Sequence, residues 1–220
     1  MDDITQLIEA ARTGPPENAG GDRFQRLLRD RRVTEDTLTV LACELYHLVR
    51  SDRRSFALLA SRFPSGTAGE LFLEMARGEG EALLLLLDFA GALGRDEAYL
   101  RAHAPRPLAH AYPAYLTQAS LYGSRSSVAL ALLANSEESG EQYARVADAL
   151  RDHYGHDDKA LGHFRYFAET PRELVDMAVA AVGEGLAAGE DPEEAVRTAR
   201  TVRAYEDLFW SCLADDVEPL

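Results

Sequence analysis

Residues 111–169, AYPAYLTQASLYGSRSSVALALLANSEESGEQYARVADALRDHYGHDDKALGHFRYFAE, decide the fold expected for this chain. Their apolar positions recur at steps of three and four, which predicts a long helix over about residues 126–153. A polar group on a buried helix face costs about 1–3 kcal/mol unless it finds a hydrogen-bond partner. The inward stripe of this helix is apolar at both ends and polar in its middle: Val128, Leu132, Asn135, Ser139, Tyr143, Val146 and Leu150. Its polar members are therefore expected to satisfy one another or to line a pocket.

The segments on either side continue the helical pattern. Alternating strand patterns with hairpin turns are nearly absent. Start signals such as Thr34 and the capping box T67-A-G-E70 precede long amphipathic runs. The sequence predicts an all-α fold, a single-domain multi-helix bundle. Residues 1–21 are expected to form an N-terminal helix and a mobile arm, and residues 22–220 a single helical domain.

Composition narrows the range of functions. The chain has 220 residues and is 46% hydrophobic, enough for a sizeable core. Its net charge of −14, from 23 basic and 37 acidic side chains, argues against nucleic acid and anionic membranes as partners. No apolar run reaches the roughly 18 residues of a membrane span. Two isolated cysteines, Cys43 and Cys212, and a start without signal-peptide order indicate a cytoplasmic protein with reduced, buried thiols.

Two groups of residues resemble metal ligands. Glu44 and His47 form an ExxH pair on one helix face, but a ferritin-type di-iron bundle requires a second such pair, which the sequence lacks. A partly exposed or hydrogen-bonded pair is the favoured interpretation. The histidine-rich run around His153, His156 and His163 falls at a helix end and a turn. Such residues more often cap backbone groups than bind a metal.

A third group consists of polar side chains on inward helix faces. Its members are Glu44, Ser139, Tyr143 and Glu206, joined by Tyr112 and Tyr115. Carboxyl and phenol groups in a dry core have raised or coupled pKa values, as general acid–base catalysis requires. The alternative is a satisfied structural network. Phosphate-loop, GxSxG and HExxH motifs are absent, which argues against nucleotide hydrolysis and against the α/β-hydrolase mechanism.

Three runs carry a resemblance to a known family: AYPAYL at 111–116, EQYARVADAL at 141–150 and YEDLFWSCL at 205–213. With the helix order, they resemble the haem-oxygenase-like fold, in the branch that holds the TenA-type thiaminase II proteins and the pyrroloquinoline quinone synthase PqqC. The resemblance places the family's final-helix glutamate on Glu206, its substrate-facing tyrosine on Tyr112 and its nucleophilic cysteine on Ser139. It also aligns CELYH with a QDxxY-like run, so that Glu44 and His47 replace an aspartate and a tyrosine.

The run LRDHYGHDDKALGHFRYFAE also resembles the haem-oxygenase-like di-iron oxidases. Their ligand positions fall here on Ser136, Phe167, Pro171 and Leu174, none of which binds iron. PqqC-like members of the fold work without a metal, so the resemblance implies neither a metal nor a cofactor.

Together these observations imply an enzyme that binds a small heteroaromatic molecule or a biosynthetic intermediate in the bundle core. Glu206 and Glu44 would transfer protons and Ser139 would stand at the nucleophile position. The substrate would be held by Tyr143, Tyr112, Tyr115, His47 and Asn135. A homo-oligomer is what the resemblance implies. The alternatives are a metal-dependent oxidase and a non-catalytic binding protein on a degenerate scaffold.

Overall fold

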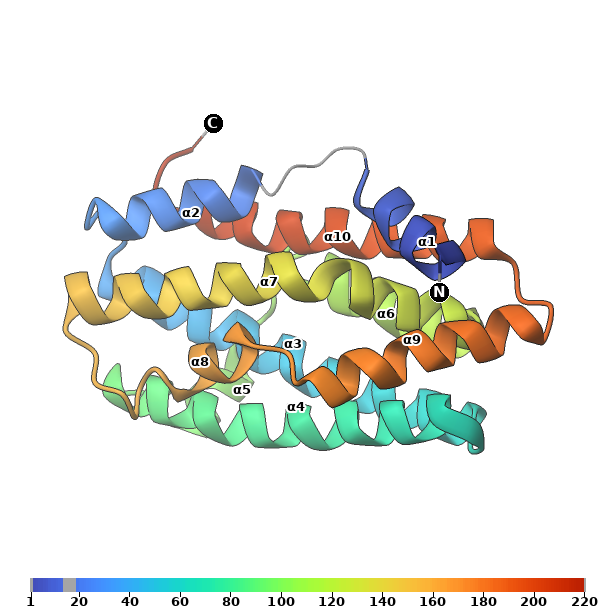
Figure 1. The fold of residues 1–220 in the computed structure, drawn as a ribbon. Helices are drawn as coiled ribbons and strands as arrows, with labels where there is room; N and C mark the ends of the chain where they lie inside the picture. The colour runs from blue at the N-terminus through green and yellow to red at the C-terminus, as the bar shows by residue number, and fades with distance from the viewer. Residues whose placement is uncertain (1, 14–18, 220) are drawn as a thin grey trace.

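The computed structural model describes residues 2–13 and 19–219, and within these ranges the chain forms ten α-helices and no strand. The predicted all-α class is confirmed. The helices are arranged as Figure 1 shows. Their bounds are α1 Asp2–Arg12, α2 Ala19–Arg29, α3 Glu35–Arg62, α4 Gly66–Ala92, α5 Glu97–Ala102, α6 Ala111–Tyr122, α7 Arg125–Tyr154, α8 Gly162–Ala168, α9 Arg172–Ala187 and α10 Pro192–Asp215.

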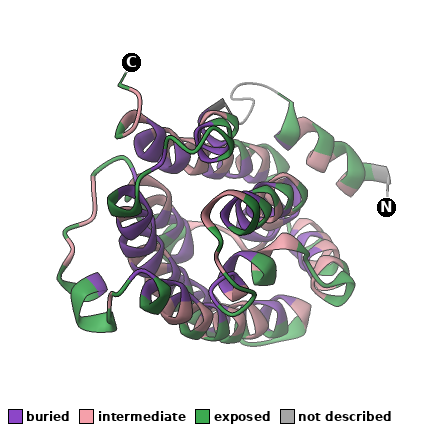
Figure 2. Cartoon of the chain, turned by 90° about the vertical axis from the view of Figure 1, so that its left-hand side faces the viewer, coloured by how far each residue is buried: buried purple, intermediate pink, exposed green. Residues whose placement is uncertain are grey.

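Six of the helices close into a ring. Going round it, α3 contacts α4, α4 contacts α9, α9 contacts α7, α7 contacts α10, α10 contacts α6, and α6 returns to α3. The remaining helices pack outside, with α2 on α10 and α7, α8 on α7 and α4, and α5 on α3. Seen end-on, buried residues line the inner faces of the long helices (Figure 2). Such a ring encloses a space that every one of its six helices can line.

The core divides into two hydrophobic clusters. One is built around Phe24, Phe89 and Trp210, and the other around Phe56 and Val128. The central helix α7 contributes to both, because its inward face is apolar towards each end. The polar middle of that face falls between the clusters. The bundle is therefore packed at both ends and polar in between.

Local signals explain where several helices begin and end. Thr34 caps α3 by accepting a hydrogen bond from the Thr37 N–H at 3.2 Å, and Gly155, with φ of 73°, ends α7 in the left-handed region. The capping box expected at T67-A-G-E70 does not start α4, which begins at Gly66. The distant carboxylate of Glu184 accepts the Thr67 N–H at 2.9 Å instead.

The predicted mobile arm falls mainly on residues 14–18, which lie outside the described residues. The helix before it, α1, packs against α7 and α10. The expected boundary between residues 21 and 22 falls inside α2.

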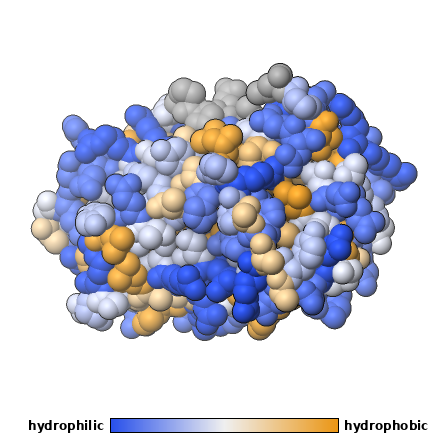
Figure 3. All heavy atoms as spheres, turned by 180° about the vertical axis from the view of Figure 1, so that it is seen from behind, coloured by the Kyte–Doolittle hydropathy of each residue, from blue (hydrophilic) through white to orange (hydrophobic). Residues whose placement is uncertain are grey.

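Hydrophilic side chains dominate the face seen from behind, and apolar side chains there form separate small patches (Figure 3). Within the described ranges, no helix combines the length and apolar character needed to cross a membrane. Cys43 and Cys212 are both buried, unbridged thiols. Burial is the main cause that raises the pKa of each to about 11.

Candidate active site inside the helical ring

The ring encloses a cavity of about 160 Å³. All six ring helices line it, together with Phe167 at the end of α8 and Thr170 in the α8–α9 connection. Thr170 is exposed, so the cavity reaches the surface at this connection. Gly140 of α7 allows the connection to approach closely, because a Cβ there would lie 2.8 Å from the Ala168 carbonyl oxygen. A cavity of about 150 Å³ accommodates a benzene molecule, so this one suits a ligand with a single ring.

Glu206 is the polar centre of the cavity. It lies on the apolar stripe of α10, one turn before Phe209. This position turns the Glu206 carboxyl inward. The Ser139 hydroxyl donates to Glu206 Oε1 at 2.8 Å, and the Asn135 amide donates to Oε2. Burial raises the pKa of Glu206, while these two hydrogen bonds oppose the shift by stabilising the charged form.

The predicted polar stripe of α7 meets this carboxyl. Asn135, Ser139 and Tyr143 lie one turn apart on the same helix face, and all three line the cavity. The Tyr143 ring packs 5.2 Å from that of Phe167 and 5.8 Å from that of Trp210, between ring centroids. Burial is the main cause that raises the pKa of the Tyr143 phenol well above its ordinary value. The aromatic wall thus adjoins the carboxyl within one ligand-sized space.

Two further carboxyl groups line the cavity, and the sequence interpretation missed both. Asp52 of α3 is 3% exposed and Glu79 of α4 is 5% exposed. Tyr112, a predicted site residue, also lines the cavity and hydrogen-bonds Asp52. Among the described residues, Asp52 Oδ1 and Glu79 Oε2 have no hydrogen-bond partner. Burial is the largest cause that raises the pKa of both carboxyls well above the usual range.

The missed residues do carry a periodic signal. Asp52 lies four residues after Leu48 and four before Phe56, on the inward stripe of α3. Glu79 lies four residues after Met75 on the corresponding stripe of α4. The run SDRR at 51–54 reads as a charged interruption, which conceals that only its aspartate turns inward.

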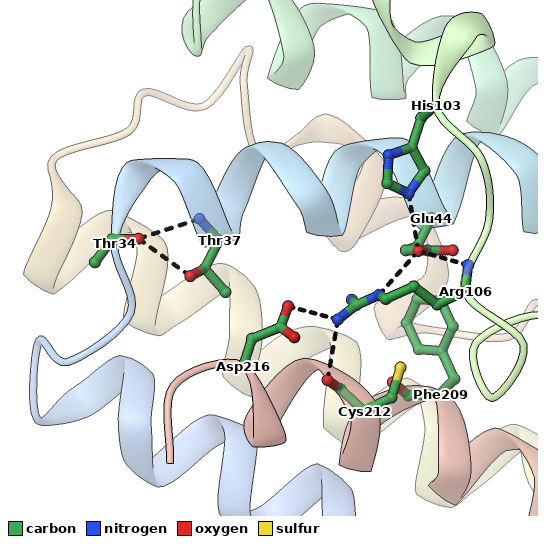
Figure 4. A network of polar contacts seen from close by, with 8 residues as sticks. All are labelled: Thr34, Thr37, Glu44, His103, Arg106, Phe209, Cys212 and Asp216. Carbon is green, nitrogen blue, oxygen red and sulfur yellow. Dashed lines mark hydrogen bonds and ion pairs between the residues drawn. The ribbon is translucent and has the colours of Figure 1, made fainter. Parts of the chain in front are cut away.

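The structure does not bring Glu44, His47 or Tyr115 into the cavity. Glu44 Oε1 is the centre of a separate network, in which it contacts His103 Nε2 at 2.9 Å and accepts from the Arg106 backbone N–H and Nε–H, each at 3.1 Å (Figure 4). His47 Nε2 lies 3.1 Å from the Leu100 carbonyl oxygen. Tyr115 packs its ring against Tyr205.

The three histidines of the 153–163 run do not converge. His163 is fully buried, with Nδ1 3.0 Å from the Ala82 carbonyl oxygen, and burial lowers its pKa to about 4. His156 packs against the Phe89 ring. In the part of the chain that the structure describes, no three His, Cys, Asp or Glu side chains are grouped so as to hold a metal ion.

The titratable groups that line the cavity are three carboxyls and two phenols: Asp52, Glu79, Glu206, Tyr112 and Tyr143. No arginine, lysine or histidine is among the described lining residues. The arrangement can transfer protons and accept hydrogen bonds. It offers no countercharge to an anionic ligand.

Solved structures share this fold at low sequence identity. A haem-oxygenase-like domain of unknown function from Shewanella denitrificans aligns with a TM-score of 0.68 and 17% identity over 98% of this chain and 89% of its own. A TenA homologue from Pyrococcus furiosus aligns with a TM-score of 0.62 and 16% identity, covering 97% of this chain and 96% of its own. A TenA homologue from P. horikoshii aligns with a TM-score of 0.63 and 16% identity, covering 96% of this chain and 94% of its own.

A search of curated proteins returned no significant match. The sequence model of the TENA/THI-4/PQQC family matches residues 23–215, which span nearly the whole helical bundle. The chain therefore belongs to the TENA/THI-4/PQQC family.

Proposed function

We propose that this chain is a TenA/PqqC-like enzyme that acts on a small heteroaromatic molecule by metal-free acid–base chemistry. The observation that carries the proposal is the Glu206 carboxyl, which is buried in the wall of a ring-sized cavity and hydrogen-bonded by Asn135 and Ser139. A buried carboxyl whose pKa is raised suits a general acid and base. Family membership supports the same class of protein.

Glu206 takes up a proton from the Ser139 hydroxyl or from water, and later returns it to the leaving group. Serine is a weak nucleophile without an adjacent base, and the contact of 2.8 Å supplies one. Asn135, Tyr143 and Tyr112 orient the ligand, and the Tyr143 and Phe167 rings offer flat faces against which it can stack.

The substrate we propose is a thiamine-salvage pyrimidine or a ring-containing biosynthetic intermediate of similar size. The reaction is hydrolysis or a cofactor-free oxidation. The proposal includes a cytoplasmic homo-oligomer. These parts rest on the family and on the dimensions of the cavity.

The test is turnover of thiamine and of its aminomethyl-pyrimidine breakdown product, followed by mass spectrometry in heavy-oxygen-labelled water. Glu206→Gln removes the proton-transfer group while keeping its shape, and Glu193→Gln, on an exposed position of the same helix, is the matched control. Turnover in the wild type and the control but not in Glu206→Gln supports the proposal. Label in the product identifies hydrolysis.

Three other outcomes would contradict the proposal. Turnover that survives in Glu206→Gln removes the acid–base role. About two iron ions per chain in freshly purified protein, with activity lost on chelation, would favour the metal-dependent oxidase. No turnover and no thermal shift with any ring compound would favour a non-catalytic binding protein.

A further inference from the structure

Two carboxyl oxygens in the cavity wall have no donor. Asp52 Oδ1 comes from α3 and Glu79 Oε2 from the neighbouring helix α4, and neither has a hydrogen-bond partner among the described residues. The two groups interact electrostatically. Buried acceptors in folded proteins are nearly always satisfied, so an unpaired one calls for an explanation.

The residues around this pair do not supply the missing donors. Tyr112 has a single hydroxyl proton and is already hydrogen-bonded to Asp52. The side chains one turn away on the two helices, Phe56 and Met75, are apolar. The described lining residues include no cationic side chain. A ligand in the cavity can supply donors to both oxygens.

We propose that the Asp52–Glu79 end of the cavity binds a cationic nitrogen group of the amidinium or guanidinium class, carried on the ring that the cavity holds. This inference rests on the proposed function in placing the ligand in the same cavity. A flat N–C–N group presents N–H donors side by side and matches carboxylate oxygens in geometry and charge. Its positive charge offsets the repulsion between the two carboxyls, which a neutral donor does not.

Glu79 is then a specificity-determining residue. With Asp52 alone, which Tyr112 already contacts, one carboxyl could be matched by a neutral ring that donates N–H bonds. A second buried carboxyl from α4 adds an acceptor and a negative charge, so it favours a cation over a neutral isostere. Burial, as the main cause, raises the pKa of both carboxyls, so a cationic partner that offsets this burial stabilises their charged forms. Glu206 from α10 remains available for proton transfer.

Three isosteric probes test this inference by calorimetric titration into the full chain: benzamidine, benzamide and benzoate. Each is a single ring with one planar substituent, and the three differ in charge. We expect benzamidine to bind about tenfold more tightly than benzamide, and benzoate to bind more weakly than either. Failure of benzamidine to bind, or equal affinity for benzamidine and benzamide, overturns the inference.

Carboxamide variants locate the contact. We expect Glu79→Gln and Asp52→Asn each to weaken benzamidine binding about tenfold and to leave benzamide binding nearly unchanged, because the charge is lost and the shape is kept. Glu70→Gln, at an exposed position of α4, is the matched control and should bind like the wild type. Unchanged benzamidine affinity in Glu79→Gln overturns the role of Glu79. If a variant does not fold, the relative affinities of the three probes for the wild type still test whether the cavity prefers a cation.

The two proposals fail separately. Glu206→Gln should lose turnover of the pyrimidine substrates and still bind benzamidine more tightly than benzamide. Turnover without discrimination between benzamidine and benzamide rejects only the cationic ligand class. Selective benzamidine binding without turnover of any salvage compound rejects only the salvage reaction.

Discussion

Asn135 decides how strongly Glu206 holds its proton. Its amide donates to the carboxylate and stabilises the charged form, which lowers the pKa against the effect of burial. Replacing Asn135 with Asp removes this donor and adds a like charge, and both changes raise the pKa of Glu206. We expect the acidic limb of the pH–rate profile to move to higher pH and turnover at neutral pH to fall about tenfold or more. An unchanged profile would show that Glu206 is not the titrating group.

Glu79 makes the stability of the protein depend on pH. Its pKa in the folded state is raised above the value of about 4.3 in an unfolded chain, so the folded state binds the proton more tightly. The stability from this proton is complete below the unfolded value and is lost as pH rises through the folded value. The titratable groups that interact with it are Asp52 from α3, Tyr112 from α6, Tyr143 from α7, Tyr166 from α8 and, near Asp52, Glu206 from α10.

Glu79→Gln should therefore gain stability relative to the wild type as pH rises. We expect the difference in the free energy of unfolding, variant minus wild type, to be larger at pH 8 than at pH 5 by about 1–3 kcal/mol, the usual cost of a buried unsatisfied group. Urea titrations of both proteins at the two pH values measure it. A difference independent of pH would mean that Glu79 titrates normally in the fold.

The network around Glu44 joins three elements at one end of the bundle. Glu44 on α3 is 1% exposed, and Arg106, in the connection between α5 and α6, links it to the Cys212 carbonyl oxygen of α10 and to Asp216 beyond the end of α10 (Figure 4). Glu44→Ala leaves the Arg106 charge without its buried partner. We expect the free energy of unfolding to fall by about 2 kcal/mol or more. This is less than for a fully buried ion pair, because the Arg106 side chain is 26% exposed.

Chemical denaturation of Glu44→Ala, paired with benzamidine titration of the variant that remains folded, checks this structural role. Stability should fall and ligand affinity should stay within about twofold of the wild type, because Glu44 lies outside the cavity lining. The reverse result, with normal stability and lost ligand binding, would show that Glu44 takes part in ligand binding.

A structural feature could be predicted from the sequence where neighbouring residues cause it, and not where residues distant in the chain cause it. The inward polar face of α7 follows from spacing alone, so Asn135, Ser139 and Tyr143 could be placed together in advance. The start of α4 could not be predicted in this way, because the carboxylate that accepts a hydrogen bond from its first turn belongs to Glu184 on α9. Glu44 and Asp52 both fall on inward positions of α3, eight residues apart. Only the packing of neighbouring helices decides which of them reaches the cavity and which meets Arg106.

The ring of six helices accounts for the location of the site. Each helix buries an apolar stripe, and the carboxyl groups that interrupt three of these stripes, on α3, α4 and α10, point into one common space. The chain as a whole carries a net charge of −14, of the same sign as the cavity lining. Such a field concentrates cations near the entrance and repels anions.

If the ligand binds in this cavity, filling the cavity with a larger side chain should abolish binding. Ala178 of α9 is 3% exposed and lines the cavity without contributing a polar group. Ala178→Leu adds three carbon atoms to the wall and leaves every carboxyl in place. Calorimetric titrations of benzamidine and of the aminomethyl-pyrimidine into the wild type and this variant provide the measurement. We expect both compounds to bind to the wild type and their affinity to fall at least about tenfold in the folded variant. Equal affinity in the two proteins, or no binding of either compound to the wild type, would contradict this prediction.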